Sequence, residues 1–198
     1  METIAEFEKA LSEDMEELFG NCHKKGNVIR SLVEHLGVTD SNVIFEAAFE
    51  AGLNPETPYP VLHFHTTLAQ KVDDELVPGI VMGLNKLNTT ISAGAFPAFG
   101  CFGYYAPLKQ VYLSYRMPVS MGALDAEHEN VRFYLGSLYE QLDIFVDFVL
   151  FLCDNPDRIT LEDYMDYLDT ITDLNNIEAR IEALEQYLKQ FEEEGMEE

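Results

Sequence analysis

Two histidines in alternate positions, His63 and His65, are the residues of this sequence best suited to metal chemistry. They lie in Val61–Ala69, which has the alternating pattern of a β-strand, so both imidazoles should project from one face. A zinc site needs three or four ligands, and no third histidine or cysteine is tied to the pair by spacing. The sequence therefore favours two surface histidines on an open sheet face, and it predicts no metal ion or other cofactor.

Nucleophilic residues occur without the sequence neighbours that activate them. Cys22 and His23 are adjacent, so their side chains diverge, whereas a catalytic Cys–His pair has to converge. Three serines lie outside any Gly-x-Ser-x-Gly motif: Ser31, Ser114 and Ser120. Asp143 and Asp147, one helical turn apart, are an acid–base pair or, more simply, solvated carboxylates on a helix rim. We therefore expect a protein that is not an enzyme, with an enzyme whose site is assembled across a sheet as an alternative.

The net charge argues against partners that carry phosphate groups. The 198 residues include 36 acidic and 12 basic ones, for a net charge of −24. A field of this sign repels nucleic-acid backbones and anionic membrane surfaces, and it attracts basic proteins. We therefore expect a protein partner, no nucleic acid and no membrane. An acidic immunity protein, or antidote, that neutralises a basic toxin remains an alternative.

Several features are typical of a cytoplasmic protein. The three cysteines, Cys22, Cys101 and Cys153, are odd in number and far apart, which fits a reducing compartment. The first residues lack the basic and apolar regions of a signal peptide. The most apolar run, residues 142–153, contains two aspartates and is too short to span a bilayer.

Helical spacing predicts two elements near the N-terminus. Residues 3–19 carry one apolar stripe, and Thr3 with Glu6 has the pattern of a capping box. A short second helix is predicted over residues 27–36, ended by Gly37.

Four segments have the pattern of β-strands. The first is rich in alanine and glutamate, so a helix remains an alternative there. The last is the clearest, and it places Tyr112, Ser114 and Arg116 on one face. The segments are residues 43–50, 61–69, 95–106 and 111–119. We expect His63, His65, Tyr112 and Arg116 to share a sheet face that contacts a partner, because interfaces favour aromatic and guanidinium groups.

Helical spacing also marks the later part of the chain. One helix starts near residues 73–74 or a few residues later, and a long one runs from about Asp125 to Asn155. We expect residues 1–155 to form a single α+β domain, with an antiparallel sheet of about five strands and helices packed on one face. Residues 156–198 are predicted to be an acidic helical extension, so acidic helices lie at both ends.

The middle of the chain resembles a known family. The resemblance rests on Val61-Leu62-His63-Phe64 in a strand, on Leu84-Asn85-Lys86-Leu87-Asn88 closing a helix, and on the strand Tyr112-Leu113-Ser114-Tyr115-Arg116-Met117-Pro118. Over about residues 43–153 this order is similar to the YbjN-like family of bacterial sensory transduction regulators, with the type III secretion chaperone-like fold. The Gly- and Phe-rich stretch 94–105 and the helices after Asn155 depart from the family pattern.

The resemblance implies a function that involves no catalysis. It implies an antiparallel sheet with helices on one face, a tendency to form homodimers, and a role in binding other proteins as a chaperone-like or regulatory adaptor. It supplies no catalytic residues. For the asparagine pair, we expect structural roles: Asn88 ends the helix in a left-handed conformation, and Asn85 bonds a neighbouring backbone group.

Overall fold

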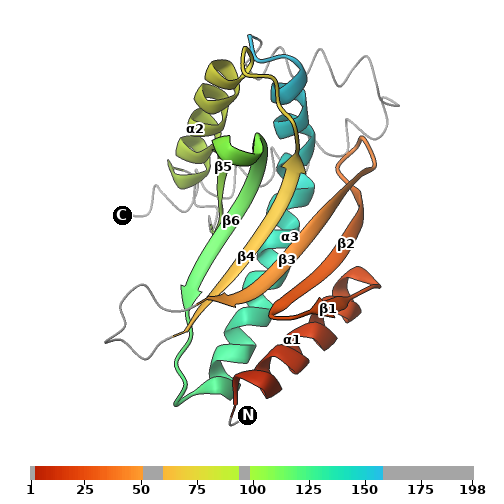
Figure 1. Cartoon of the computed structure of the whole chain (residues 1–198), viewed down its shortest axis with the longest axis vertical. Helices are drawn as coiled ribbons and strands as arrows, with labels where there is room; N and C mark the ends of the chain where they lie inside the picture. The colour runs from red at the N-terminus through yellow and green to blue at the C-terminus, as the bar shows by residue number, and fades with distance from the viewer. Residues whose placement is uncertain (1–2, 51–59, 94–98, 158–198) are drawn as a thin grey trace, which may run out of the picture.

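A six-stranded antiparallel sheet and three α-helices make up the described part of this computed structural model, which covers residues 3–50, 60–93 and 99–157. Helices α1 and α3 lie against one face of the sheet, and α2 lies beside β5 (Figure 1). The predicted α+β class is therefore confirmed, with six strands where about five were expected. The elements are α1 (Ile4–Phe19), β1 (His23–Lys25), β2 (Val28–Leu36), β3 (Ser41–Glu50), β4 (Val61–Ala69), α2 (Val77–Ala93), β5 (Cys101–Tyr105), a 3-10 turn η1 (Ala106–Leu108), β6 (Gln110–Pro118) and α3 (Leu124–Asp154).

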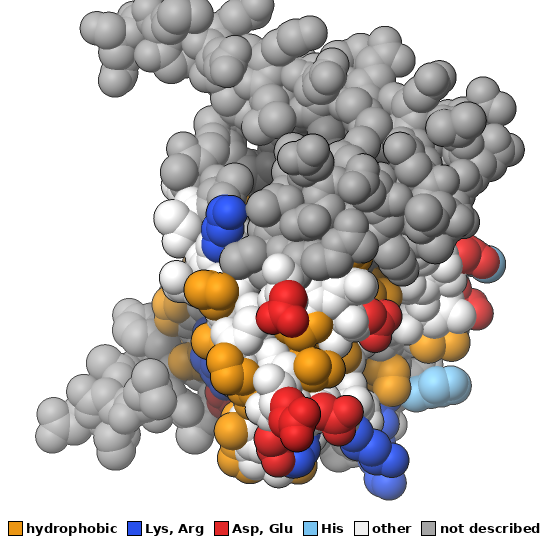
Figure 2. Space-filling view, turned by 90° about the horizontal axis from the view of Figure 1, so that it is seen from above, with side chains coloured by type: hydrophobic (Ala, Val, Ile, Leu, Met, Phe, Trp, Pro, Cys, Tyr) orange, Lys and Arg blue, Asp and Glu red, His pale blue; other side chains and the backbone are white. Residues whose placement is uncertain are grey.

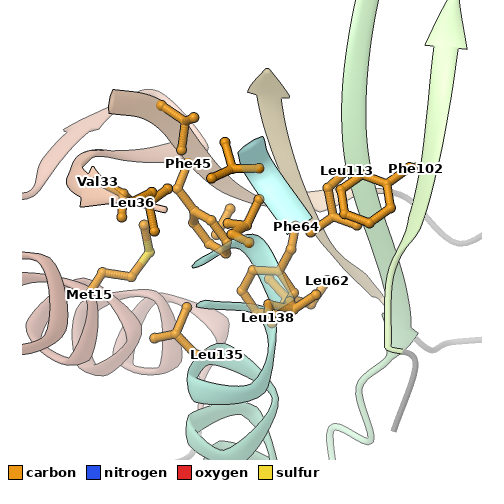
Figure 3. Close-up of a cluster of buried hydrophobic side chains, with 14 of the residues drawn as sticks. Met15, Val33, Leu36, Phe45, Leu62, Phe64, Phe102, Leu113, Leu135 and Leu138 are labelled. Carbon is orange, nitrogen blue, oxygen red and sulfur yellow. The ribbon is translucent and has the colours of Figure 1, made fainter. Parts of the chain in front are cut away.

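The strands follow the order β1-β2-β3-β4-β6-β5, and every neighbouring pair is antiparallel. Alternate residues point toward the helices, so Phe45 and Phe64 are almost fully buried. In Figure 3, Met15 of α1 and Leu135 and Leu138 of α3 lie on the helix side of this cluster. The core therefore sits between one face of the sheet and α1 with α3.

Both ends of α1 follow from local chemistry. The Thr3 hydroxyl accepts a hydrogen bond from the Glu6 amide at 3.2 Å, and the Glu6 carboxylate accepts one from the Thr3 amide at 3.3 Å. Gly20 ends the helix with a φ of 73°. The predicted helix over residues 3–19 and its capping box are confirmed.

The helix predicted over residues 27–36 is wrong, because this segment is strand β2. Ile29, Ser31 and Val33 are buried, and the residues between them face the other side. This alternation with β-branched residues fits a strand, because a helix would scatter the three buried positions around its axis. Gly37, with a φ of 69°, therefore begins the turn from β2 to β3 and ends no helix.

Two aspartates of α3 hold that turn. The buried carboxylate of Asp147 accepts hydrogen bonds from the amides of Val38 and Thr39 at 2.7 and 3.1 Å, and one from the Thr39 hydroxyl. Asp143 accepts one from the Gly37 amide at 2.8 Å. Asp143 and Asp147 therefore join α3 to the end of the sheet, which is a structural role.

The remaining elements agree closely with the patterns. The strands over 43–50, 61–69 and 111–119 are confirmed. Of the predicted strand over 95–106, β5 covers Cys101–Tyr105, and residues 95–98 lie outside the described residues. Helix α2 starts at Val77, a few residues after the two aspartates, and α3 ends at Asp154 beside Asn155. The predicted extension over 156–198 lies outside the described residues, apart from its first two positions. Within the described residues, no helix combines the length and apolar character needed to cross a bilayer.

Two asparagine side chains occupy the outer edges of the sheet. The Asn88 amide donates to the Phe102 carbonyl at 2.8 Å and accepts from the Phe102 amide at 2.9 Å. Asn21 makes the same pair of bonds to Leu32 of β2, both at 2.8 Å. Because α2 continues to Ala93, the prediction that Asn88 ends the helix is wrong. Its side chain instead takes the place that a further strand would fill.

Replacing Asn88 by alanine should lower the free energy of unfolding by about 1–3 kcal/mol, because two backbone groups of Phe102 lose their partner. The matched control is Asn85→Ala, on the exposed side of the same helix, which should change stability by less than about 0.5 kcal/mol. Both substitutions bring the same gain in helix propensity, so urea unfolding of the two variants isolates the contact. Equal stabilities would contradict this role of Asn88.

Candidate functional site

The sheet side opposite α1 and α3 is the candidate site, and we call it the open face. Its side chains alternate with core residues along four strands. They are Val28, Arg30, Leu32, Ile44, Glu46, Ala48, Glu50, His63, His65, Thr67, Tyr112, Ser114 and Arg116. Of the described helices, α1 and α3 cover the other face, so within the described part of the chain these side chains face outward.

The structure brings together all four residues predicted to share this face. His63 of β4 pairs directly with Arg116 of β6, and the next positions along each strand follow from the same register. The His63 and His65 ring centroids are 5.7 Å apart, and the Tyr112 ring stacks on His65 with centroids at 5.2 Å. The four side chains therefore form one continuous polar and aromatic strip.

His63 also contacts Ser114, which the sequence places on the same face as Tyr112 and Arg116, and Glu50, which was not predicted to join them. Its Nδ1 lies 2.8 Å from Glu50 Oε1, and its Nε2 lies 2.9 Å from Ser114 Oγ. Arg116 donates from Nε to Glu50 Oε2 at 3.2 Å. In the sequence, Glu50 and Ser114 fall at outward-facing positions of the strands predicted over 43–50 and 111–119. This alternation does not show which residues of neighbouring strands pair with each other.

Burial and neighbouring charges shift two pKa values on the open face. The pKa of His65 is lowered, first because partial burial disfavours the imidazolium and then because His63 lies nearby. The pKa of Glu50 is lowered although partial burial opposes the change, since hydrogen bonds from His63 and Arg116 favour the carboxylate. The strip therefore favours a neutral His65 beside an ionised Glu50.

A hollow of about 280 Å³ lies on the open face above the histidines. Its lining is formed by Val28, Glu46, Ala48, His63, His65, Tyr105, Leu108 and Gln110. Tyr105 and Leu108 are 49% and 58% exposed, and Glu46 accepts a hydrogen bond from Arg30 Nε at 2.8 Å. The hollow therefore combines apolar walls with imidazole groups.

Positive and negative charges are balanced on the open face. Arg30 and Arg116 stand against Glu46 and Glu50, in a chain whose net charge is −24. At the end of the molecule shown in Figure 2, acidic, basic and hydrophobic side chains are interspersed. Within the described residues, the open face therefore carries no excess of acidic side chains.

Metal binding finds no support in the described side chains. Nowhere in residues 3–50, 60–93 and 99–157 do three or more His, Cys, Asp or Glu side chains form a group able to hold a metal ion. Both ring nitrogens of His63 already contact oxygen atoms of Glu50 and Ser114. The two histidines therefore belong to a hydrogen-bonded strip.

The three cysteines are free thiols in different surroundings. Burial raises the pKa of Cys22, and it raises the pKa of Cys153 to about 12, so both thiols resist ionisation. Cys101 is exposed on β5 and pairs directly with Ser114 of β6. Cys101 is therefore the thiol next to the candidate site.

A second cluster of charged side chains lies between α1 and α3. Asp14 contacts His128 Nε2 at 2.6 Å and Arg132 Nε at 3.3 Å, and the Asp14 and His128 side chains are largely buried. These contacts link the two helices that cover the sheet. We assign the cluster a structural role.

Comparison with family models, with curated proteins and with solved structures found no match for this chain. The resemblance to the YbjN-like family therefore stays a prediction.

The lowered pKa of His65 predicts a loss of stability on the acid side. Its folded pKa lies below the ordinary 6.5, so the unfolded state binds the proton first as the pH falls. This contribution to the free energy of unfolding is complete above about pH 6.5 and is lost as the pH falls toward the folded pKa. His65→Gln should therefore flatten the pH dependence of urea unfolding below pH 6.5.

The matched control is His23→Gln, since His23 is exposed on β1. Its pH dependence should follow that of the unchanged protein. A His65→Gln profile identical to that of the unchanged protein would contradict the effect of burial on His65.

Proposed function

We propose that this protein is a protein-binding module that holds its partner on the open face, as a chaperone-like or regulatory adaptor. The observation that supports this most is the combination of a hollow with a charge-balanced strip of imidazole, aromatic and guanidinium groups. Aromatic and arginine side chains are enriched where proteins meet, whereas unbalanced charge is depleted from interface centres.

The edges of the sheet are poorly suited to the other common way of binding a peptide. In strand addition, an extended peptide bonds to unpaired backbone groups of an edge strand. Asn88 already bonds such groups at Phe102 of the edge strand β5, and Asn21 bonds Leu32 of β2 beyond the end of the edge strand β1, which is only three residues long. This supports contact through side chains of the open face.

The charge balance of the open face indicates the chemistry of the partner. A partner drawn mainly by charge would be strongly basic and would be released at high salt. Tyr105 and Leu108 instead offer exposed apolar area at the hollow. We therefore propose a partner segment that places an aromatic or aliphatic side chain in the hollow, with polar groups around it. The acidic antidote to a basic toxin remains the competing proposal.

The double variant Tyr112→Ala with Arg116→Ala should abolish capture of the partner from native lysate. The unchanged protein should retain the same partner at high salt, because apolar contacts are not screened. The matched control is Phe133→Ala, which removes an aromatic side chain that is 62% exposed on α3. This control should capture the partner normally.

Two results would contradict the proposal. Equal capture by the double variant and by the Phe133→Ala control would remove the open face from the interface. A basic partner lost at high salt but unaffected by the Tyr112 and Arg116 substitutions would favour the antidote. Size-exclusion chromatography of each variant shows whether the captured protein is a second copy, which the resemblance implies.

A further inference from the structure

Three side chains of the open face follow the order carboxylate, imidazole, hydroxyl. Glu50 Oε1 lies 2.8 Å from His63 Nδ1, and His63 Nε2 lies 2.9 Å from Ser114 Oγ. They come from β3, β4 and β6, whose register places them in one line. In nucleophilic hydrolases the same order makes a serine reactive, with histidine as the base and the carboxylate orienting it.

We propose that Ser114 is a nucleophile activated by His63 and oriented by Glu50, and that the open face hydrolyses small acyl esters. This activity goes beyond the proposed binding function and does not depend on it. It assigns specific residues to the alternative interpretation, in which the protein is an enzyme whose site is assembled across the sheet. No serine-hydrolase motif is needed, because the convergence comes from strand register and not from local sequence.

The chemistry balances with an ester and water as the only reactants. Ser114 Oγ bonds to the acyl carbon while His63 Nε2 takes the hydroxyl proton; the ester C–O bond then breaks, and the departing alkoxide receives that proton to become an alcohol. Water next attacks the acyl-serine, and His63 takes a proton from it. That proton returns to Ser114 Oγ as the carboxylic acid is released.

The contacts around Ser114 and His63 each have a role in these reaction steps. In the tautomer that the proposal requires, Nδ1–H donates to Glu50 and the lone pair of Nε2 is directed at Ser114. Arg116 places Nη1 at 3.5 Å from Ser114 Oγ, close to where negative charge develops. A cationic side chain is needed there, since backbone amides inside a sheet are bonded to neighbouring strands.

The hollow limits the size of the substrate. Its volume of about 280 Å³ is at the small end for ligand sites, and of the three proposed groups His63 lines it, while Ser114 lies next to it through its contact with His63. The exposed side chains of Tyr105 and Leu108 offer contact to an apolar group. The geometry therefore favours short acyl or small aromatic esters over long-chain lipids or polysaccharides.

The test uses the full chain and a fluorophosphonate probe, which bonds covalently to activated serines. Peptide mapping by mass spectrometry should find a single adduct on Ser114, and Ser114→Ala should abolish it. His63→Ala should slow the labelling roughly 10²-fold, which is the lower range for loss of a general base.

Two controls separate activation of Ser114 from other effects. Cys101→Ala removes the neighbouring thiol, and Ser92→Ala removes an exposed hydroxyl of α2; both should label at the rate of the unchanged protein. Circular dichroism confirms that each variant is folded. Hydrolysis of p-nitrophenyl acetate, lost in Ser114→Ala, supports turnover.

Two outcomes would overturn the proposal. One is the absence of an adduct on Ser114 in the unchanged protein, which would leave the three contacts as hydrogen bonds that only order the face. The other is equal labelling rates in the unchanged protein, His63→Ala and Glu50→Gln, which would show that Ser114 is not activated. Neither result bears on the binding proposal, whose test uses Tyr112 and Arg116.

Discussion

The structure depends on one constraint: helices cover a single face of the sheet. Phe45 and Phe64 are buried against α1 and α3, so the residues between them must point to the other side. The same alternation that buries Phe64 therefore exposes His63 and His65. A shift of one residue in the pairing would reverse both faces, so packing in the core also fixes the composition of the open face.

Side chains that bond backbone groups of the sheet add to this packing of helices on one face. Asn21 and Asn88 bond backbone groups at the two sides of the sheet, while Asp147 joins the β2–β3 turn to α3. Such contacts discourage pairing with a further strand. The open face is therefore the broad surface available for side-chain recognition, and the proposed reactive serine lies within it. A partner bound there would also cover Ser114 and control the access of water.

Local signals predicted much of the fold, whereas contacts between strands escaped prediction. Alternation in 61–69 and 111–119 and the Thr3–Glu6 pair were sufficient for two strands and a helix. The segment 27–36 was predicted to be a helix, but it forms a strand. Its alternate residues are buried on the side of α1, and this contact between distant segments cannot be seen in the local pattern. Glu50 and Ser114 were missed as neighbours of His63 because their meeting depends on the register of three strands.

Photo-cross-linking is the most direct test of the claim that the open face contacts the partner. A benzoylphenylalanine residue in place of Tyr105 puts the probe at the hollow, and one in place of Phe133 puts it on the exposed side of α3. If the open face contacts the partner, irradiation in cells should join the partner to the protein only through position 105. Cross-linking through position 133 alone would contradict this claim.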